Sequence, residues 1–410
     1  MNVRPFQGYR YGIGRVRDVS KVVAPPYDQI SPETQERLHA MSPENIVRVT
    51  LPRDVRGLDK YARARQSLDV WLADGVWARE ESPAIYPYHQ TYTVAGTTIT
   101  RMGFVALGEV TDYRQGVVLP HERTHAGPKQ DRMALLEATG ADIGLLFMLT
   151  RDPSGELRRA TAPAGPPVAE ARDLKGERHA LWRVTDPDAI ARLQALMAER
   201  HVIIADGHHR YETAVEYRRR HPEATEKLMA FFALEAPGLT ILPNHRLVHR
   251  VAGWSFDGLQ SAAREWFEVR PLPDPLAFRP TNREIGVVSG GGAAIFALRD
   301  DAAARVPWPA GTSPAWRKLA VSILHEALLK PLLDVTEAKL DAKTHVEYTA
   351  DQAEAVALAR GGRYQAAFLI APTTHAELED VVRGGELLPQ KSTHFYPKLL
   401  DGLVFYRPGQ

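Results

Sequence analysis

The 410-residue sequence contains no cysteine, and this absence removes several classes of protein at once. Disulfide scaffolds, zinc ribbons and thiol nucleophiles all require cysteine, so none of them is expected. The sequence also lacks an apolar run close to the roughly 20 residues that a membrane helix needs, and its first residues lack the apolar core of a signal peptide. We therefore expect a cytoplasmic protein that has no membrane partner.

An excess of charge of either sign is missing as well. The sequence has 51 lysine and arginine residues against 50 aspartate and glutamate residues, which leaves a formal net charge of +1. Proteins that bind a nucleic-acid backbone usually carry a basic excess, so a nucleic-acid partner is not expected. An acidic ligand would have to be bound by a local cationic patch.

The order of the predicted elements indicates a mixed α/β fold of the α+β type. The run at 202–205 is typical of a buried strand, and the segment at 211–220 is typical of a helix. A β-hairpin is expected around Ala95-Gly96, and "IVRVTL" at 46–51 alternates like a strand. The Gly-rich "VSGGGAAIF" lacks a dinucleotide or P-loop pattern and predicts a hairpin turn. We divide the chain into an N-terminal arm and α/β segment at 1–82, a core at 83–250 and a C-terminal α+β domain at 251–410.

The stretch "ADGHHRYETA" places polar chemistry where the strand passes into the helix. Gly207 allows a turn with positive φ and leaves backbone N–H groups at a helix N-terminus. His208, His209 and Arg210 add donors and cations, a combination that suits a phosphate group. Asp206 could hold Mg²⁺ or orient a substrate amine. The alternative is an ordinary helix in which Asp206 is the N-cap and the histidines are solvated.

The loop "LPHERTHAGPKQDR" places Glu122 among cationic side chains. These neighbours should keep its carboxylate ionised, so that it can accept a hydrogen bond from a hydroxyl group or orient a water molecule. The same neighbours make it a weaker base. On the residues alone, a surface loop with compensating charges is the simpler interpretation. The neighbouring cationic residues are His121, Arg123, His125, Lys129 and Arg132.

The segment "HERTH" also matches the HExxH pattern of zinc peptidases. That pattern works because a helix places both histidines on one face. Pro120 precedes the segment and Ala126-Gly127-Pro128 follow it, so a helix is not expected here. A metallohydrolase built on this segment therefore stays a minor alternative.

Three further segments carry polar groups that could contribute to an anion site. Each also has a structural interpretation as a rigid turn, a proline-fixed arm or a strand start. The residues are Lys391, Ser392 and Thr393 in "LPQKSTHFYPK", Tyr27 and Asp28 in "KVVAPPYD", and His245 and Arg246 in "LPNHRLVHR".

These motifs together closely resemble the bacterial family known as domain of unknown function 1015. The matching segments are "RPFQG", "APPYDQIS", "LPHERT", "DGHHRYETA", "LPNHRLV" and "LPQKSTHFYPK", which run from Pro5 to Lys398. That family distantly resembles the ParB/sulfiredoxin-like superfamily, whose Gly-x-(His/Arg)-Arg turn binds nucleotide phosphates. Its free-serine kinase branch has a "PHE" segment ahead of an "LDGHHR" segment. The resemblance implies a ParB/sulfiredoxin-like core at 83–250.

The resemblance also implies roles for particular residues. Pro120-His121-Glu122 and the turn at 206–210 match the two kinase segments, so Glu122 would be the general base on a hydroxyl group. Asp206 and His209 would complete the catalytic set. Cations at Lys129, Arg132 and Lys391 would neutralise charge in the transition state. The expected substrate- and phosphate-binding residues are Gly207, His208, Arg210, His121, Thr124, Lys129, Arg132, His245, Arg246, Lys391, Ser392, Thr393, Tyr27 and Asp28.

These expectations favour an enzyme of phosphoryl transfer or phosphate-ester hydrolysis. Its substrate would be a small phosphorylated metabolite, with serine or phosphoserine as the best candidate, and Mg²⁺ and ADP or ATP would take part. A different class, a nucleotide-sensing or DNA-associated regulator of the ParB kind, is the alternative. The near-neutral charge and the lack of a clear helix-turn-helix argue against that alternative. The oligomeric state is left open.

Overall fold

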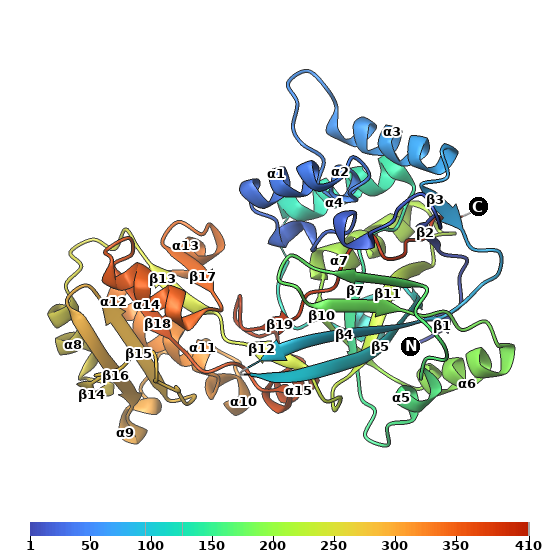
Figure 1. The fold of residues 1–410 in the computed structure, drawn as a ribbon. Coiled ribbons are helices and arrows are strands. Elements are labelled where there is room, and N and C mark those ends of the chain that lie inside the picture. Colours follow the sequence, from blue (N-terminus) through green and yellow to red (C-terminus); the bar gives the residue numbers. More distant parts are fainter. Residues whose placement is uncertain (95, 125, 409–410) are drawn as a thin grey trace. The chain divides into compact units, whose positions relative to one another are not determined.

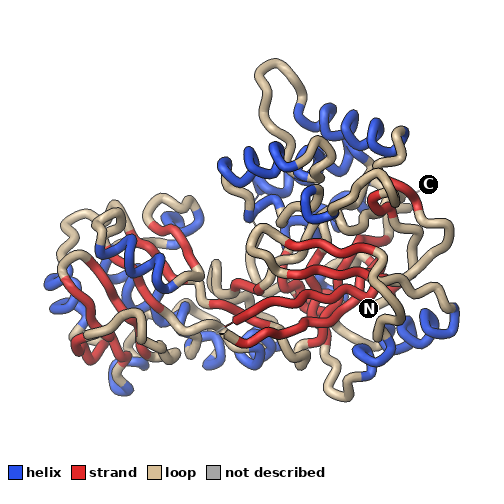
Figure 2. Tube along the Cα trace, in the orientation of Figure 1, coloured by secondary structure: helices blue, strands red, loops and turns tan. Residues whose placement is uncertain are grey.

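The computed structural model of the chain describes residues 1–94, 96–124 and 126–408 (Figure 1). It divides the chain into two compact units. Unit 1 is formed by Met1–Pro120, Thr124–Thr240 and the C-terminal segment from Pro397, whereas unit 2 is formed by His121–Arg123 and Ile241–Tyr396. Figure 2 shows strands collected into sheets, with helices beside them, in both units. The predicted mixed α/β fold class is therefore confirmed.

The three predicted segments and the two units are different divisions of the chain. Segments 1–82 and 83–250 both contribute to unit 1, and the end of segment 251–410 returns to it. As functional domains, the three segments stay a prediction. Of the expected hairpin, Ala95 lies outside the described residues, while the strands on either side of it pair in antiparallel fashion.

Unit 1 is built on a mixed sheet with the strand order β6-β10-β7-β11-β5-β4-β9-β8, and β1 also pairs with β5. The strand β10 pairs in parallel with β6 and antiparallel with β7, which places the end of β10 at Asp206 inside the sheet rather than at its edge. The strands are β1 Val3–Arg4, β4 Tyr86–Val94, β5 Thr97–Glu109, β6 Val118–Leu119, β7 Leu146–Thr150, β8 Ala169–Arg172, β9 Arg178–Leu181, β10 Val202–Asp206 and β11 Glu226–Ala233, with the separate pair β2 Tyr9–Tyr11 and β3 Trp77–Arg79.

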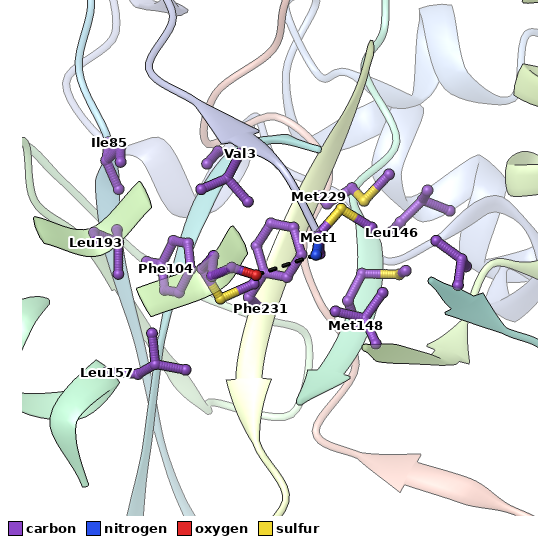
Figure 3. Close-up of a cluster of buried hydrophobic side chains, with 14 of the residues drawn as sticks. Met1, Val3, Ile85, Phe104, Leu146, Met148, Leu157, Leu193, Met229 and Phe231 are labelled. Carbon is purple, nitrogen blue, oxygen red and sulfur yellow. Dashed lines mark hydrogen bonds between the residues drawn. The ribbon is translucent and has the colours of Figure 1, made fainter. Parts of the chain in front are cut away.

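One face of this sheet carries the apolar core shown in Figure 3. Residues two apart on a strand point to the same face, and the buried residues of the cluster follow that spacing. They are Leu146 and Met148 on β7, Val202 and Ile204 on β10, Phe104 and Ala106 on β5, and Met229 and Phe231 on β11. Leu193 and Met197 of the helix at Pro187–Ala198 cover them. The strand that leads into the turn at Gly207 is therefore packed against this apolar core.

The helices of unit 1 begin largely where their capping residues predict. Ser31 accepts a hydrogen bond from the amide of Thr34, and Asp186 accepts one from the amide of Asp188. Figure 1 shows α1 to α4 gathered together, away from α5 and α6. The helices are η1 Val19–Lys21, η2 Tyr27–Gln29, α1 Pro32–Met41, α2 Val47–Thr50, α3 Lys60–Ala73, η3 Tyr113–Gln115, α4 Ala126–Thr139, α5 Glu156–Ala160, α6 Pro187–Ala198 and α7 His208–Arg220.

The strand expected at 46–51 is wrong, because the segment forms the short helix α2. The side chain of Asn45 accepts a hydrogen bond from the amide of Val47 and donates to the carbonyls of Lys21 and Val23. This buried asparagine starts the helical turn. Consecutive residues of the segment are buried, so its alternation does not mark one exposed and one buried face.

The C-terminal segment returns to unit 1 and pairs with its N-terminal strands. Asp401 forms a backbone bridge with Ala24, and Phe405 forms one with Tyr9. The rings of Tyr9 and Phe405 stack with their centroids 4.9 Å apart. The return of the chain fixes the positions of Lys398 and Asp401 within unit 1.

Unit 2 contains an antiparallel sheet with the order β14-β16-β15-β18-β13-β17. The predicted hairpin turn is confirmed, since β15 and β16 pair directly and Ser289 lies opposite Gly292. The strands are β12 Thr240–Leu242, β13 His245–Val248, β14 Phe267–Pro271, β15 Glu284–Ser289, β16 Gly292–Leu298, β17 Val346–Thr349, β18 Ala366–Leu369 and β19 His394–Tyr396. The helices are α8 Phe256–Ala263, α9 Asp300–Ala303, α10 Pro314–Arg317, α11 Ala320–Ile323, the π-helical η4 Leu324–Leu329, α12 Lys330–Leu333, α13 Glu337–Asp341, α14 Gln352–Arg360 and α15 His375–Arg383.

Among the helices of the described residues, none combines the length and the apolar character that crossing a membrane requires.

Candidate functional site

The turn between β10 and α7 has the geometry expected from its sequence. Gly207 has φ 98° and ψ 25°, and it is the N-cap of α7. A Cβ atom at this position would lie 2.8 Å from Cδ2 of Leu146, so the turn needs glycine for space as well as for its φ angle. The N-cap itself is a glycine, so it offers no side chain to accept from the first-turn amides. The helix therefore presents its positive end and its first-turn amides at the turn.

Asp206 is not the cap that the simpler interpretation required. Its carboxylate lies 3.3 Å from Nζ of Lys398 and 3.5 Å from Nη2 of Arg210. The carbonyl of Lys398 accepts a hydrogen bond of 2.8 Å from Gln90, which ties the lysine to the sheet. The charge of Asp206 is thus balanced by two cations within unit 1.

The residues around Asp206 do not form a magnesium site of their own. The described residues contain no group of three or more histidine, cysteine, aspartate or glutamate side chains placed to hold a metal ion. Mg²⁺ is commonly held by one or two carboxylates together with substrate phosphates. Asp206 already has two cationic neighbours, Lys398 and Arg210, and the proposed phosphoryl transfer is written without a metal ion.

Arg210 lies beneath the turn rather than extended toward solvent. Its residue is 8% exposed, and its Nη1 donates to the carbonyl of Leu145 at 2.8 Å. Burial lowers the pKa of Arg210, but the charges of Asp401, Asp206 and Asp28 together raise it by more than burial lowers it. The pKa of Arg210 is therefore above its ordinary value. Arg210 therefore supplies buried positive charge next to the turn. His208 is also buried, whereas His209 is half-buried.

The segment with Tyr27 and Asp28 belongs to the same charged neighbourhood. The guanidinium of Arg132 lies 4.1 Å from the centre of the Tyr27 ring, and its Nη1 donates to the carbonyl of Thr50 at 2.7 Å. Burial raises the pKa of Tyr27, and Asp28 adds to the rise, while Arg210 and Arg132 oppose it. The structure thus brings Tyr27, Asp28, Arg132 and Arg210 together in unit 1.

Asp401 is a charged residue of this neighbourhood that sequence reasoning missed. It is 3% exposed and lines a cavity of about 60 Å³ together with Arg210, Arg132 and Lys227. The sequence does contain a signal: "LLDGLVF" places a single carboxylate inside an otherwise apolar run. Lys398 was noticed in its loop but was not assigned to the site.

Thr124 and Lys129 meet on one carboxylate of α7. The hydroxyl of Thr124 donates to Oε2 of Glu212 at 2.6 Å, and Nζ of Lys129 donates to the same oxygen at 2.8 Å. Lys129 is therefore an ion-pair partner of Glu212 within unit 1. Glu122, in contrast, belongs to unit 2.

In unit 2, the "PHE" segment contacts the "QKST" loop. Oε1 of Glu122 accepts a hydrogen bond of 3.5 Å from the amide of Lys391. Nε2 of His121 is 2.9 Å from the hydroxyl of Thr393, and its carbonyl accepts from the amide of Leu388 at 2.9 Å. Lys391 has φ 58°, an uncommon value for a residue other than glycine that often marks functional loops.

Arg246 holds this loop from inside the unit. It is fully buried, and its Nη2 donates to the carbonyls of Gln390 and Lys391 at 3.2 Å each. Burial lowers the pKa of Arg246 to about 10, although Tyr348 and Glu122 act in the opposite direction. The contacts of Arg246 are those of a residue that fixes the loop.

Two other predicted phosphate ligands of unit 2 have structural contacts. Nδ1 of His245 accepts a hydrogen bond of 3.3 Å from the amide of Ile370, and burial lowers the pKa of His245 to about 4. The hydroxyl of Ser392 donates to the carbonyl of Pro389. His245 is therefore neutral at pH 7, and the Ser392 hydroxyl is committed to its own loop.

The described part of the HExxH segment is not helical. His121–Thr124 precede α4, which begins at Ala126, and His125 lies outside the described residues. The helical geometry that would place two zinc-binding histidines on one face does not extend over the described part of the motif.

The fold and the turn define a mixed α/β protein with a glycine-bounded helix N-terminus. The family model described as "Protein of unknown function (DUF1015)" matches residues 3–322, and the chain belongs to this family. The resemblance stated from the motifs is thereby confirmed. None of the curated proteins matches the chain.

Several solved structures are similar to the chain at low identity. A conserved hypothetical protein from Pyrococcus furiosus has 12% identity and a TM-score of 0.39, covering 72% of this chain and 93% of its own. A free serine kinase variant in complex with ADP has 12% identity and a TM-score of 0.37, covering 71% and 86%. C-terminally truncated SbnI from Staphylococcus aureus has 12% identity and a TM-score of 0.34, covering 72% and 85%. The free serine kinase named by the motif resemblance is thus among the similar structures.

Proposed function

We propose that this protein transfers a phosphoryl group between a nucleotide and a small hydroxyl-bearing metabolite, with serine as the first candidate. The observation that supports the proposal best is the turn at Gly207. It combines a positive φ angle, a 13-residue helix whose N-cap is a glycine, and two cations next to Asp206 at the start of the turn. Such a helix N-terminus binds anions through its amides and its dipole.

The proposed roles in unit 1 concern the phosphate. The amides of the first turn of α7 would donate to the phosphate oxygens, and the buried charge of Arg210 would favour the anion from below. Lys398, whose Nζ lies 3.3 Å from Asp206, would turn to a bound phosphate. Asp206 would then be available to the amine of the acceptor.

The proposed chemistry needs only one proton acceptor. The acceptor oxygen forms a bond to phosphorus while the bond from phosphorus to the nucleotide oxygen breaks, and the electron pair leaves with that oxygen. The proton of the acceptor hydroxyl passes to a carboxylate base, the role that the motif resemblance implies for Glu122. With water as acceptor and phosphoserine as donor, the bond from phosphorus to the seryl oxygen breaks, and that oxygen takes up the proton that the water has given to the base, which yields serine and phosphate. A positioned general base of this kind contributes a factor of about 10² to 10⁴ in rate.

The test is turnover by the purified chain. Serine and phosphoserine are each mixed with AMP, ADP or ATP, with and without Mg²⁺, and phosphorus NMR follows the products. We expect turnover with at least one pair and a loss of about 10² to 10⁴ in rate for Glu122→Gln. The control variant is Glu223→Gln, which removes an exposed carboxylate. The absence of turnover with every pair would remove the enzymatic proposal, and nucleotide binding without turnover would favour the nucleotide-sensing alternative.

A further inference from the structure

Asp401 is a buried carboxylate that the proposed mechanism does not use. Its residue is 3% exposed, and its Oδ1 has no hydrogen-bond partner among the described residues. Buried polar atoms in native proteins are nearly always satisfied, because an unmade hydrogen bond to a buried charge is costly. A carboxylate in this state calls for an explanation in terms of its neighbours.

Charged and titratable groups of several elements line the cavity together with Asp401. Lys227 and Asp142 form an ion pair with each other, and Arg132 pairs with Asp131. Arg210 is the remaining cation that lines the cavity. The titratable and charged groups are Arg210 on α7, Arg132 on α4, Lys227 on β11, Asp142 ahead of β7, and Tyr27 and Asp28 on η2.

Arg210 is shared between Asp401 and the phosphate-binding turn. Its Nη2 lies 3.5 Å from Asp206 at the turn, and its Nε has no hydrogen-bond partner in the described part of the chain. Burial lowers the pKa of Arg210, and among the charges that raise it Asp401 acts more strongly than Asp206. The guanidinium of Arg210 therefore interacts with Asp206 at the turn and with Asp401 at the cavity, and Asp401 has the larger effect on its pKa.

We propose that Asp401 is a positioning residue of the phosphate-binding turn, which acts through Arg210 and is regulated by protonation of its carboxylate. The proposal rests on the proposed function, since it needs a phosphate at Gly207. The negative charge of an ionised Asp401 partly compensates the positive charge of Arg210, which weakens the attraction between Arg210 and the bound anion. A protonated Asp401 no longer compensates Arg210, so more of the arginine's charge acts on the anion and the anion binds more tightly.

The carboxyl group titrates in the range where such control matters. Burial raises the pKa of Asp401 to about 7, with Asp28 acting in the same direction, while Arg210, Arg132 and Lys227 oppose the rise. Below that pH the residue is neutral and binding is strong; above it the residue is charged and binding weakens. Coupling between sites is reciprocal, so binding of the anion should take up a proton near neutral pH.

The test compares the wild type with Asp401→Asn, which imitates the protonated state. Affinity for ADP is measured from about pH 6 to about pH 8, and the ratio of the two dissociation constants is taken at each pH. Ionisation of the nucleotide affects both proteins and cancels in the ratio. We expect equal affinities near pH 6 and a variant that binds about fivefold to tenfold more tightly near pH 8, at the lower end of typical coupling. Asp301→Asn, an exposed change in unit 2, should follow the wild type throughout.

Each outcome decides the question. A ratio that stays constant over the whole range, with both proteins binding ADP, overturns the role of Asp401 and leaves the phosphate site intact. Failure of both proteins to bind ADP overturns the phosphate site and this inference with it. If the variant does not fold, binding of inorganic sulfate to the wild type provides the second measurement, because sulfate does not titrate in this range. A wild-type affinity for sulfate that does not change with pH overturns the inference.

Discussion

Replacement of Gly207 by alanine tests whether the turn requires a residue without a Cβ atom. The φ angle of 98° costs an alanine about 1–3 kcal/mol, as left-handed conformations do for residues other than glycine. The added Cβ would lie 2.8 Å from Cδ2 of Leu146 and 3.1 Å from Nε of Arg210. Leu146 is fully buried in the core of unit 1, so its displacement adds about 1–3 kcal/mol of overpacking. We therefore expect Gly207→Ala to lower the free energy of unfolding by about 2–6 kcal/mol.

Gly57→Ala is the matched control within unit 1. Gly57 has φ 80°, but a Cβ atom there would meet nothing within 4 Å, so this variant reports the cost of the backbone conformation alone. That cost should be about 1–3 kcal/mol, without the overpacking that Gly207→Ala adds. Urea unfolding of the three proteins, with the free energy extrapolated to water, gives the comparison. Equal losses for the two variants would refute the argument that Leu146 and Arg210 close off the turn.

Three further changes test other parts of the structure. Lys398→Met keeps an unbranched side chain but removes the charge next to Asp206, so affinity for ADP should fall about tenfold, as for a lost charge-assisted contact; unchanged affinity would exclude Lys398 from the phosphate site. The imidazole of His245 should stay neutral down to about pH 4 in an NMR titration. Because its folded pKa lies below its unfolded value, its contribution to the stability of the fold should be complete above about pH 6.5 and should be lost as the pH falls from about 6.5 to 4. An NMR titration midpoint near pH 6.5 would contradict the buried environment of His245. Leu193→Ala, in the core of unit 1, should lower the free energy of unfolding by about 2–5 kcal/mol, whereas Ile13→Ala, at a 97% exposed position, should change it by less than about 0.5 kcal/mol.

Local chemistry made several elements predictable from the sequence. The glycine between "VIIAD" and "HHRYETA" required a strand, a turn and a helix in that order, and the structure has β10, Gly207 and α7. Ser31 and Pro32 at the start of α1 are a local signal of the same kind, since the cap satisfies an amide within the first turn. The helix α2 was missed because its alternating pattern is set by tertiary burial and by Asn45 rather than by a sheet.

The charged site was only partly predictable. The motifs singled out Arg210, Tyr27 and Arg132, but not that these residues line a cavity together with a buried carboxylate. Asp401 reaches the site because the chain returns to pair with Ala24, a contact between residues far apart in sequence that no local pattern encodes. The commitment of His245 to a backbone amide likewise depends on the pairing of β13 with β18.

The most direct test of the central proposal is a crystal structure of the protein with ADP bound. The account predicts that the terminal phosphate lies at the N-terminus of α7, within hydrogen-bond distance of the backbone amides that follow Gly207. A nucleotide whose phosphates settle away from this turn would contradict it.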